Sequence, residues 1–148
     1  MQIDTATAAD IPQLNALLSI LFTQEAEFTP DPQAQARGLA LIVGNPAVGV
    51  ILVAREGNAV LGMVNLLFTV STALGEKVAL LDDLVVAADR RGAGIGSRLL
   101  DRAIAFAREQ ACRRITLNTD RSNESARRIY QRHGFVTSNM IPMRLLLT

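Results

Sequence analysis

Hydrophobic positions in the first part of the chain recur with the period of an α-helix. Residues 11–21 place their apolar side chains on one helix face. Thr7 and Asp10 precede this run at the spacing of a capping box. A break at 29–32 and a weaker helical stretch up to 44–46 follow. The chain is therefore predicted to open with two helices.

The pattern then changes to that of β-strands. Residues 48–54 are rich in β-branched side chains, and a turn at 56–58 leads into a longer apolar run at 59–70. This arrangement predicts a hairpin. A loop at 71–77 precedes another apolar run at 78–86, which predicts a further strand.

The last part of the chain alternates between helical and strand patterns. The helical period returns at Gly96, a strand is predicted at 113–119, and a short helix at 123–133 is closed by Gly134. From Phe135 onward the pattern predicts one or two final strands. Together these elements predict an α/β (α+β) fold, a sandwich built on one mixed β-sheet flanked by helices.

Composition narrows the class of protein. A length of 148 residues suits a single domain over 1–148, and 49% hydrophobic residues exclude a disordered chain. The net charge of +1 provides no general field for nucleic acid or an anionic membrane. No apolar stretch reaches the length of about 18 residues that a membrane span needs, and no secretory signal is visible. We therefore expect a cytoplasmic protein with neither nucleic acid nor membrane among its partners.

Two scarce residue types limit the chemistry further. The single cysteine, Cys112, excludes an internal disulfide framework and a multi-cysteine zinc site. The single histidine, His133, excludes histidine-rich metal sites and most histidine-based catalytic triads. We expect no metal, and we expect His133 to act as a helix C-terminal partner. The arginines between 113 and 132 lack the interleaved aromatic residues typical of a nucleic-acid surface.

The most informative stretch is a strand that enters a glycine-rich loop and then a helix. Residues 92–96 include three glycines. Such a loop allows backbone N–H groups to converge, and the helix behind it adds partial positive charge. Both features favour a phosphate or pyrophosphate ligand. The loop lacks the lysine of a nucleotide P-loop, and Ser97 stands where a dinucleotide fingerprint has glycine. A loop without a ligand is the alternative.

Two motifs in register resemble the signatures of the GNAT family of N-acetyltransferases. The string R-G-A-G-I-G at 91–96 is similar to the family pattern R/Q-x-x-G-x-G/A. Residues 123–135 resemble the second signature, which runs from asparagine through tyrosine to Gly-Phe. The early helix after Ala-x-Asp-Ile-Pro is similar to the family's first helix. The resemblance covers nearly the whole chain and implies the GNAT acyl-CoA N-acyltransferase fold.

The resemblance implies that acetyl-CoA is the cosubstrate and binds between two diverging parallel strands, here 78–86 and 113–119. The pantetheine arm is expected to pair with the backbone of Leu84, Val85 and Val86. The pyrophosphate is expected to bind the backbone amides of Gly92, Ala93, Gly94, Ile95, Gly96 and Ser97. Because peptide groups make these contacts, we expect Gly94 and Gly96 to be the least replaceable positions.

Two polar side chains are also implied as coenzyme contacts. Arg91 is expected to add charge near the phosphates, with a solvated arginine as the alternative. Asn123 is expected to hydrogen-bond the pantetheine or nearby backbone, with a plain helix cap as the alternative.

Tyr130 is the only tyrosine in the sequence, and it falls at the family's general-acid position. A phenol within hydrogen-bond reach of the leaving thiolate can protonate or stabilise the sulfur. The alternative is a core aromatic residue beside Ile129.

The general base is expected on the strand at 78–86. Asp82 and Asp83 are neighbours, so strand alternation predicts that they point to opposite faces and that only one enters the cleft. The resemblance favours Asp82. Since unpaired burial of a carboxylate is costly, we expect a solvated cleft or an arginine partner. A structural role for both residues is the alternative, and Asn118 stands where some relatives place a carboxylate.

These observations predict an N-acetyltransferase that moves an acetyl group from acetyl-CoA to a primary amine by direct attack. No cysteine is placed for a covalent intermediate. The acceptor is expected to be a small-molecule or peptide amine, and Glu25, Glu27, Asp82 and Asp83 favour a cationic one. The rival hypothesis is a non-catalytic acyl-CoA-binding sensor, and a third is a structural domain without ligand. The acyl length is left open, as is a homodimer, since relatives often dimerise through their terminal strands.

Overall fold

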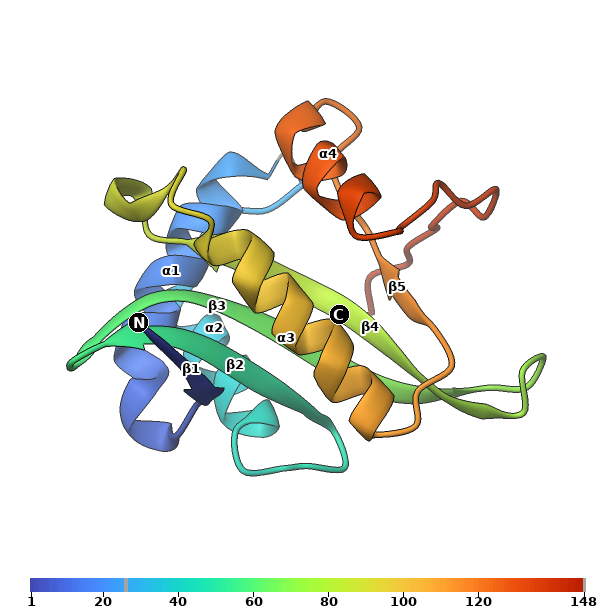
Figure 1. The fold of residues 1–148 in the computed structure, drawn as a ribbon, viewed down its shortest axis with the longest axis horizontal. Coiled ribbons are helices and arrows are strands. Elements are labelled where there is room, and N and C mark those ends of the chain that lie inside the picture. Colours follow the sequence, from blue (N-terminus) through green and yellow to red (C-terminus); the bar gives the residue numbers. More distant parts are fainter. Residues whose placement is uncertain (26, 148) are drawn as a thin grey trace.

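A computed structural model describes residues 1–25 and 27–147 of the chain (Figure 1). The elements, in chain order, are β1 (Gln2–Thr5), the 3-10 helix η1 (Ala8–Asp10), α1 (Ile11–Gln24), α2 (Pro32–Ile42), β2 (Gly49–Glu56), β3 (Ala59–Ser71), β4 (Glu76–Val86), the 3-10 helix η2 (Ala88–Arg90), α3 (Ile95–Glu109), β5 (Ile115–Leu117) and α4 (Glu124–Arg132). Within the described residues, no helix has the length and apolar content to cross a membrane.

The strands form one five-stranded sheet in the order β1-β2-β3-β4-β5. The first four strands pair antiparallel with their neighbours, and β5 pairs parallel to β4. Helices α1 and α2 cover one face of the sheet and α3 covers the other (Figure 1). The predicted fold class, a mixed sheet flanked by helices, is confirmed.

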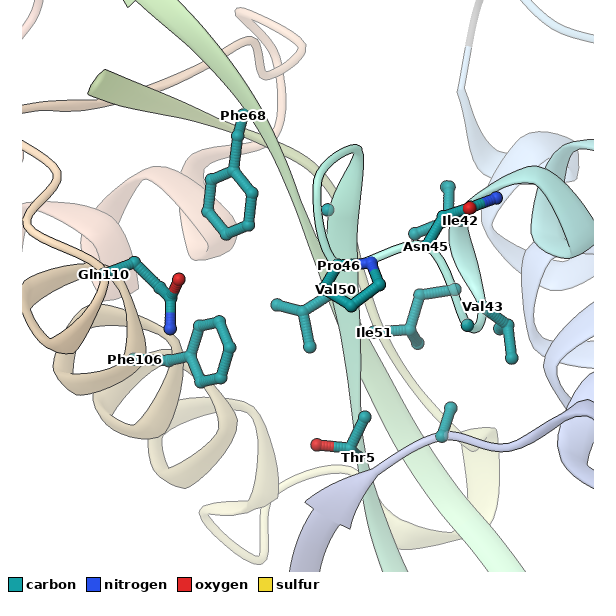
Figure 2. A pocket seen from close by; sticks show the side chains of 13 residues that line it. Thr5, Ile42, Val43, Asn45, Pro46, Val50, Ile51, Phe68, Phe106 and Gln110 are labelled. Atoms are coloured by element: carbon teal, nitrogen blue, oxygen red, sulfur yellow. The ribbon is translucent and has the colours of Figure 1, made fainter. Parts of the chain in front are cut away.

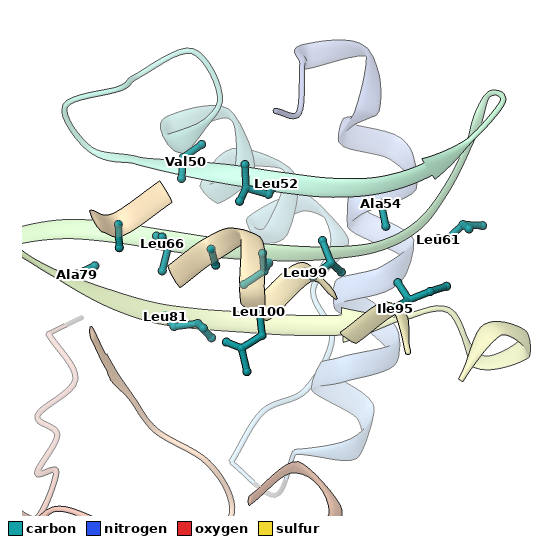
Figure 3. Close-up of a cluster of buried hydrophobic side chains, with 13 residues drawn as sticks. Val50, Leu52, Ala54, Leu61, Leu66, Ala79, Leu81, Ile95, Leu99 and Leu100 are labelled. Atoms are coloured by element: carbon teal, nitrogen blue, oxygen red, sulfur yellow. The ribbon is translucent and has the colours of Figure 1, made fainter. Parts of the chain in front are cut away.

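Each face of the sheet carries its own buried core. Leu99 and Leu100 of α3 are fully buried against a group that includes Leu66 and Leu81 (Figure 3). On the opposite face, α1 packs its apolar stripe against side chains such as Met63. Fully burying one such side chain stabilises the fold by about 1.5–3 kcal/mol.

The predicted capping box at the start of the helical region is present, and it is tied to the sheet. The Asp10 carboxylate accepts a hydrogen bond from the Thr7 backbone N–H at 2.8 Å. The Arg55 guanidinium of β2 donates to both carboxylate oxygens of Asp10 at 2.9 Å. The paired carboxylate thus fixes the entry to α1 against β2.

A β-bulge interrupts the pairing of β3 with β4. Leu66 pairs with Leu81 and Val64 pairs with Leu84, so Asn65 lies opposite two residues of β4. Leu81 and Leu84 pack on the same α3-side core although they are three positions apart. Asp82 and Asp83, which lie between them, therefore both face the α1 side. The expectation that they point to opposite faces is wrong, because the bulge inserts an extra residue into the alternation.

Three further elements differ from the sequence-based prediction. The strand β1 was not predicted, and β5 covers only the middle of the range 113–119. The expected final strands are absent, since residues 135–147 form neither helix nor strand. An apolar, β-prone run becomes a strand only where a sheet edge satisfies its backbone groups, and this run pairs with none of the described strands.

Candidate functional site

The strands β4 and β5 part where the coenzyme is expected. Their parallel pairing ends at Leu81 with Leu117, whereas β4 continues to Val86. On the β5 side, the edge of β4 beyond Leu81 faces no strand among those described. Leu84, Val85 and Val86 lie on this unpaired edge. An extended ligand can pair with such an edge through backbone hydrogen bonds.

The glycine loop connects this edge to α3. Gly92 and Gly94 have φ angles of +83° and +82°, which favour glycine because a side chain would be strained there. The first backbone N–H of α3 that bonds within the helix is that of Arg98, which donates to the Gly94 carbonyl. The amides before Arg98 in α3 have no intrahelical acceptor and carry the helix's partial positive charge.

Gly96 behaves differently from Gly92 and Gly94. A Cβ added at Gly96 would meet only the Val86 Cγ2 atom, at an ordinary contact distance of 3.7 Å. The fold itself therefore leaves room for alanine at Gly96. A requirement for glycine there would come from a ligand that approaches the backbone.

The two polar side chains expected at the coenzyme make local contacts. Arg91 is exposed, and its Nε lies 3.5 Å from the Val86 carbonyl oxygen, at the limit of a hydrogen bond. The Asn123 Oδ1 accepts a hydrogen bond from the Ala126 backbone N–H at 3.2 Å, so Asn123 caps α4. The capping alternative is observed for Asn123, and its Nδ2 is the group left for a ligand.

The bulge brings two carboxylates to the cleft side of β4 in different surroundings. Asp83 is buried, with 8% of its surface exposed, whereas Asp82 is exposed. Burial raises the pKa of Asp83 to about 7; the negative charge of Asp82 adds to this rise, and a hydrogen bond from Asn65 opposes it. Although the Asp82 side chain reaches solvent, partial desolvation by the surrounding protein also raises its pKa, against the attraction of Arg144.

A third carboxylate approaches from the C-terminal end of α1. Burial raises the pKa of Glu25, and the charges of Asp120, Asp82 and Glu27 raise it further. The loop after β5, the end of α1 and the bulge of β4 thus gather negative charge in one region.

Tyr130 of α4 faces the same region. Its ring packs edge-on against Phe135, with the two centroids 5.7 Å apart. Burial raises the pKa of Tyr130 to about 12, and the charges of Glu25 and Asp83 contribute to the rise. The phenol therefore stays protonated at neutral pH, as a proton donor must.

Sequence reasoning missed Asn65 and Arg144. Asn65 is a lone amide inside the apolar run of β3, and it is only 2% exposed. A polar residue in such a run needs a buried partner, and this was the signal available in the sequence. The Arg144 guanidinium pairs with Glu27 and lies over the Phe28 ring, 5.9 Å from its centroid. No pattern in the sequence connects Arg144 with α1.

The remaining chemically active side chains lie elsewhere. The His133 Nε2 is 3.0 Å from the Asp101 carboxylate, and its Nδ1 is 2.8 Å from the Ile129 carbonyl oxygen, so His133 joins α4 to α3. Cys112 is partly buried beside the α3-side core, and burial raises the pKa of its thiol. Among the described residues, no group of three histidine, cysteine or acidic side chains is placed to hold a metal ion.

A separate cavity of about 260 Å³ opens between β2, the end of α2 and the end of α3 (Figure 2). Its walls include Val50, Phe68 and Phe106. None of the expected site residues lines it. The candidate site is therefore defined by the parting of β4 and β5 and by the side chains around it.

The chain is similar to acetyltransferases in both sequence and fold. Residues 13–135 match the sequence profile described as the acetyltransferase (GNAT) family. An uncharacterized N-acetyltransferase of Bacillus subtilis, YhfO, is 32% identical over 123 residues, which cover 81% of this chain and 82% of the relative. An aminoalkylphosphonate N-acetyltransferase of Salmonella typhimurium is 31% identical over 134 residues, covering 90% and 84%. The solved structure of an integron cassette protein from the mobile metagenome of Cole Harbour Salt Marsh superposes with a TM-score of 0.85 at 27% identity, covering 99% and 91%.

Proposed function

Because the chain belongs to the GNAT acetyltransferase family and is an acetyl-CoA-dependent acyltransferase, we propose that residues 1–148 form one N-acetyltransferase domain acting on a primary amine by direct attack. One observation carries the proposal. The unpaired edge of β4 runs into the glycine loop, and Asp83 and Tyr130 lie near enough for the charge of Asp83 to raise the pKa of Tyr130. This arrangement supports a coenzyme site beside a pair of groups that can transfer protons.

The residues present fit acetyl-CoA, which supplies the activated acetyl group. The edge formed by Leu84, Val85 and Val86 offers backbone groups to the pantetheine arm. The amides of residues 92–97 offer donors to the pyrophosphate at the start of α3. Arg91 adds positive charge at the loop. The Asn123 Nδ2, at the start of α4, is the donor proposed for the pantetheine arm.

Tyr130 is the proposed general acid. Its phenol remains protonated well above neutral pH, so it can donate a proton to the departing sulfur. Replacing Tyr130 with phenylalanine keeps the ring on Phe135 and removes only the donor. Cys112 takes no part in this scheme, because burial raises the pKa of its thiol and the thiolate is the nucleophilic form.

The base is one of the two carboxylates of the bulge. Asp82 is the residue predicted from the family resemblance, and it is the more exposed of the two. Asp83 faces the same side of the sheet, so the structure adds it as a candidate.

The acceptor proposed for this site is an amine that carries a second positive charge. The negative charges of Asp82 and Glu25 raise the pKa of Asp83, and the charge of Asp82 also raises the pKa of Glu25. The Arg144 guanidinium, which pairs with Glu27 and lies over the Phe28 ring, is a cation bound at the edge of this region. A negatively charged phosphonate, the group named for the Salmonella relative, would be repelled here.

The test is release of free thiol from acetyl-CoA in the presence of a panel of amines. We expect turnover with diamines and little with an aminoalkylphosphonate of the same chain length. Tyr130→Phe should lower kcat by about 10²–10⁴-fold and leave acetyl-CoA binding in place. Saturating acetyl-CoA, at about 100 times its Kd, should stabilise both proteins by about 2.7 kcal/mol. Binding without turnover for any amine would favour the sensor hypothesis.

A further inference from the structure

A single buried side chain organises the β-bulge beside the proposed site. The Asn65 Oδ1 accepts hydrogen bonds from the backbone N–H groups of Asp82 at 3.2 Å and Asp83 at 2.7 Å. The Asn65 Nδ2 donates to the Asp83 Oδ2 at 2.8 Å. These hydrogen bonds join β3 to Asp82 and Asp83, the two residues of β4 that lie opposite Asn65 in the bulge. Asn65 therefore both closes the bulge and holds one of its carboxylates.

We propose that Asp83 accepts the proton released by the acceptor amine and that Asn65 is its positioning residue. The inference rests on the proposed N-acetyltransferase function and names the residues that move the amine's proton within it. It replaces the preference for Asp82 that the family resemblance gave.

The hydrogen bonds leave one oxygen of Asp83 ready to act. The Oδ2 atom is held by Asn65, whereas no hydrogen bond from the described part of the chain reaches Oδ1. The bond to Asn65 fixes the rotation of the carboxyl group, because the amide is itself anchored to two backbone N–H groups. A carboxylate held at one oxygen and open at the other is suited to accept a proton at a defined position.

Asp82 lacks these features. Its side chain is exposed, and no hydrogen bond among those of the described residues holds its carboxylate. Its charge faces Asp83 on one side and Arg144 on the other. We assign Asp82 the role of a charged neighbour that strengthens the proton affinity of Asp83.

The groups that face Asp83 come from four parts of the fold. They are Asp82 on β4, Glu25 on α1, Tyr130 on α4 and Asn65 on β3. Burial and the two carboxylates raise the pKa of Asp83 to about 7, while the Asn65 bond lowers it. A group with this pKa exchanges its proton readily at neutral pH, which is what a general base requires.

The proton transfers balance with the groups named. The amine nitrogen forms a bond to the thioester carbonyl carbon, the carbon–sulfur bond breaks, and the nitrogen's proton passes to the Asp83 Oδ1. The Tyr130 hydroxyl gives its proton to the sulfur. Transfer of the Asp83 proton to the tyrosinate through solvent restores both residues, so the products are an amide and a free thiol.

The experiment compares the pH dependence of kcat for the wild-type protein and five variants with one diamine acceptor. We expect the wild-type kcat to rise with pH through about 7, since Asp83 must lose its proton before it can accept another. Asp83→Asn should lower kcat by about 10²–10⁴-fold and abolish this rise. The asparagine introduced can still accept the bond from the Asn65 Nδ2, so the fold should persist.

Two variants shift the rise in opposite directions. Asn65→Ala removes the hydrogen bond that favours the charged form of Asp83, so the increase of kcat with pH should move to higher pH. Asp82→Asn removes a like charge, so the rise should move to lower pH with kcat reduced less than tenfold. If Asn65→Ala does not fold, Asn65→Ser provides a smaller hydroxyl in its place and should shift the rise the same way.

Gln35→Ala is the matched control. Gln35 is also a buried amide with several hydrogen bonds, but it joins α2 to α1. Its loss should lower stability without moving the pH profile, which separates positioning from a purely structural effect. The inference would be overturned if Asp83→Asn kept the wild-type kcat, or if the pH profile were unshifted in both Asn65 variants. In either case, turnover by the wild-type protein would leave the proposed function intact. Absence of turnover with every amine would instead remove the proposed function.

Discussion

Two buried carboxylates show how the surroundings of a single residue decide its chemistry. Asp10 meets the Arg55 guanidinium, whose hydrogen bonds hold the pKa of that carboxyl below its usual range. Asp83 meets an amide and two other carboxylates, and its pKa rises to about 7. The folded state therefore favours the charged form of Asp10 and the protonated form of Asp83. Asp10 serves the fold, and the raised pKa of Asp83 supports the proton-transfer role proposed for it.

The free energy of unfolding should depend on pH because of the raised pKa of Asp83. Its pKa of about 7 lies above the unfolded value of 3.8, so its contribution is most favourable below 3.8 and is lost as the pH rises to about 7. A rise of the pKa from 3.8 to about 7 corresponds to a cost of about 4 kcal/mol in the free energy of unfolding at pH 8. Asp83→Asn removes the titration, so the variant should unfold at higher urea concentration than the wild type at pH 8.

The measurement is urea unfolding of both proteins between pH 5 and pH 8.5. The stability advantage of Asp83→Asn should shrink steadily as the pH falls, because the wild-type carboxyl regains its proton. The exposed Asp82 provides the control, since Asp82→Asn should change stability by a smaller amount. An advantage that stayed constant with pH would contradict the argument.

At the scale of elements, the glycine loop separates the needs of the fold from those of a ligand. Gly92 has a φ angle of +83° and must stay glycine for the backbone to turn. Gly96 lies in α3 with 3.7 Å between its added Cβ and the nearest atom. Gly96→Ala should therefore keep or slightly raise the thermal midpoint, since alanine favours a helix by about 1 kcal/mol over glycine. It should also lose the stabilisation by acetyl-CoA.

Gly92→Ala should show the reverse pattern. The strained backbone should lower the thermal midpoint in the absence of coenzyme, by about 1–2 kcal/mol of unfolding free energy. The two variants are compared by thermal unfolding with and without acetyl-CoA. If Gly96→Ala bound acetyl-CoA as the wild type does, the close approach of a ligand to α3 would be excluded.

The sequence predicted the elements whose signals are local and missed those that depend on pairing. The glycine loop, α3 and α4 follow from periodicity, caps and turn residues, and they were predicted. The bulge at Asn65 was not, because it consists of one strand gaining a residue relative to another. Its consequence was the wrong assignment of Asp82 and Asp83 to opposite faces. The sequence could therefore place the glycine loop and the two carboxylates on their elements, but it could not give the direction that the carboxylates face or their contact with Asn65.

At the scale of the whole molecule, the C-terminal segment, residues 135–147, exposes apolar side chains, whereas the two cores bury theirs. Seven large apolar side chains in this segment are between 79% and 93% exposed. They are Val136, Met140, Ile141, Met143, Leu145, Leu146 and Leu147. Monomers rarely expose apolar patches larger than a few hundred Å². Burial of each side chain is worth about 1.5–3 kcal/mol, so together they can offset the association cost of about 4–15 kcal/mol.

We expect the protein to self-associate through this segment, with a second copy of the chain covering it. Light scattering coupled to size-exclusion chromatography should give the mass of an oligomer for the wild type and that of a monomer for the double variant Leu145→Ser, Leu147→Ser. The matched control is Leu41→Ser with Val70→Ser, because these apolar residues are also exposed, at 67% and 70%, but lie outside the segment. That control should remain associated. A monomeric wild type at every concentration would contradict this expectation, and the contacts of Arg144 with Glu27 and with the Phe28 ring would then be what holds the segment beside the acidic region.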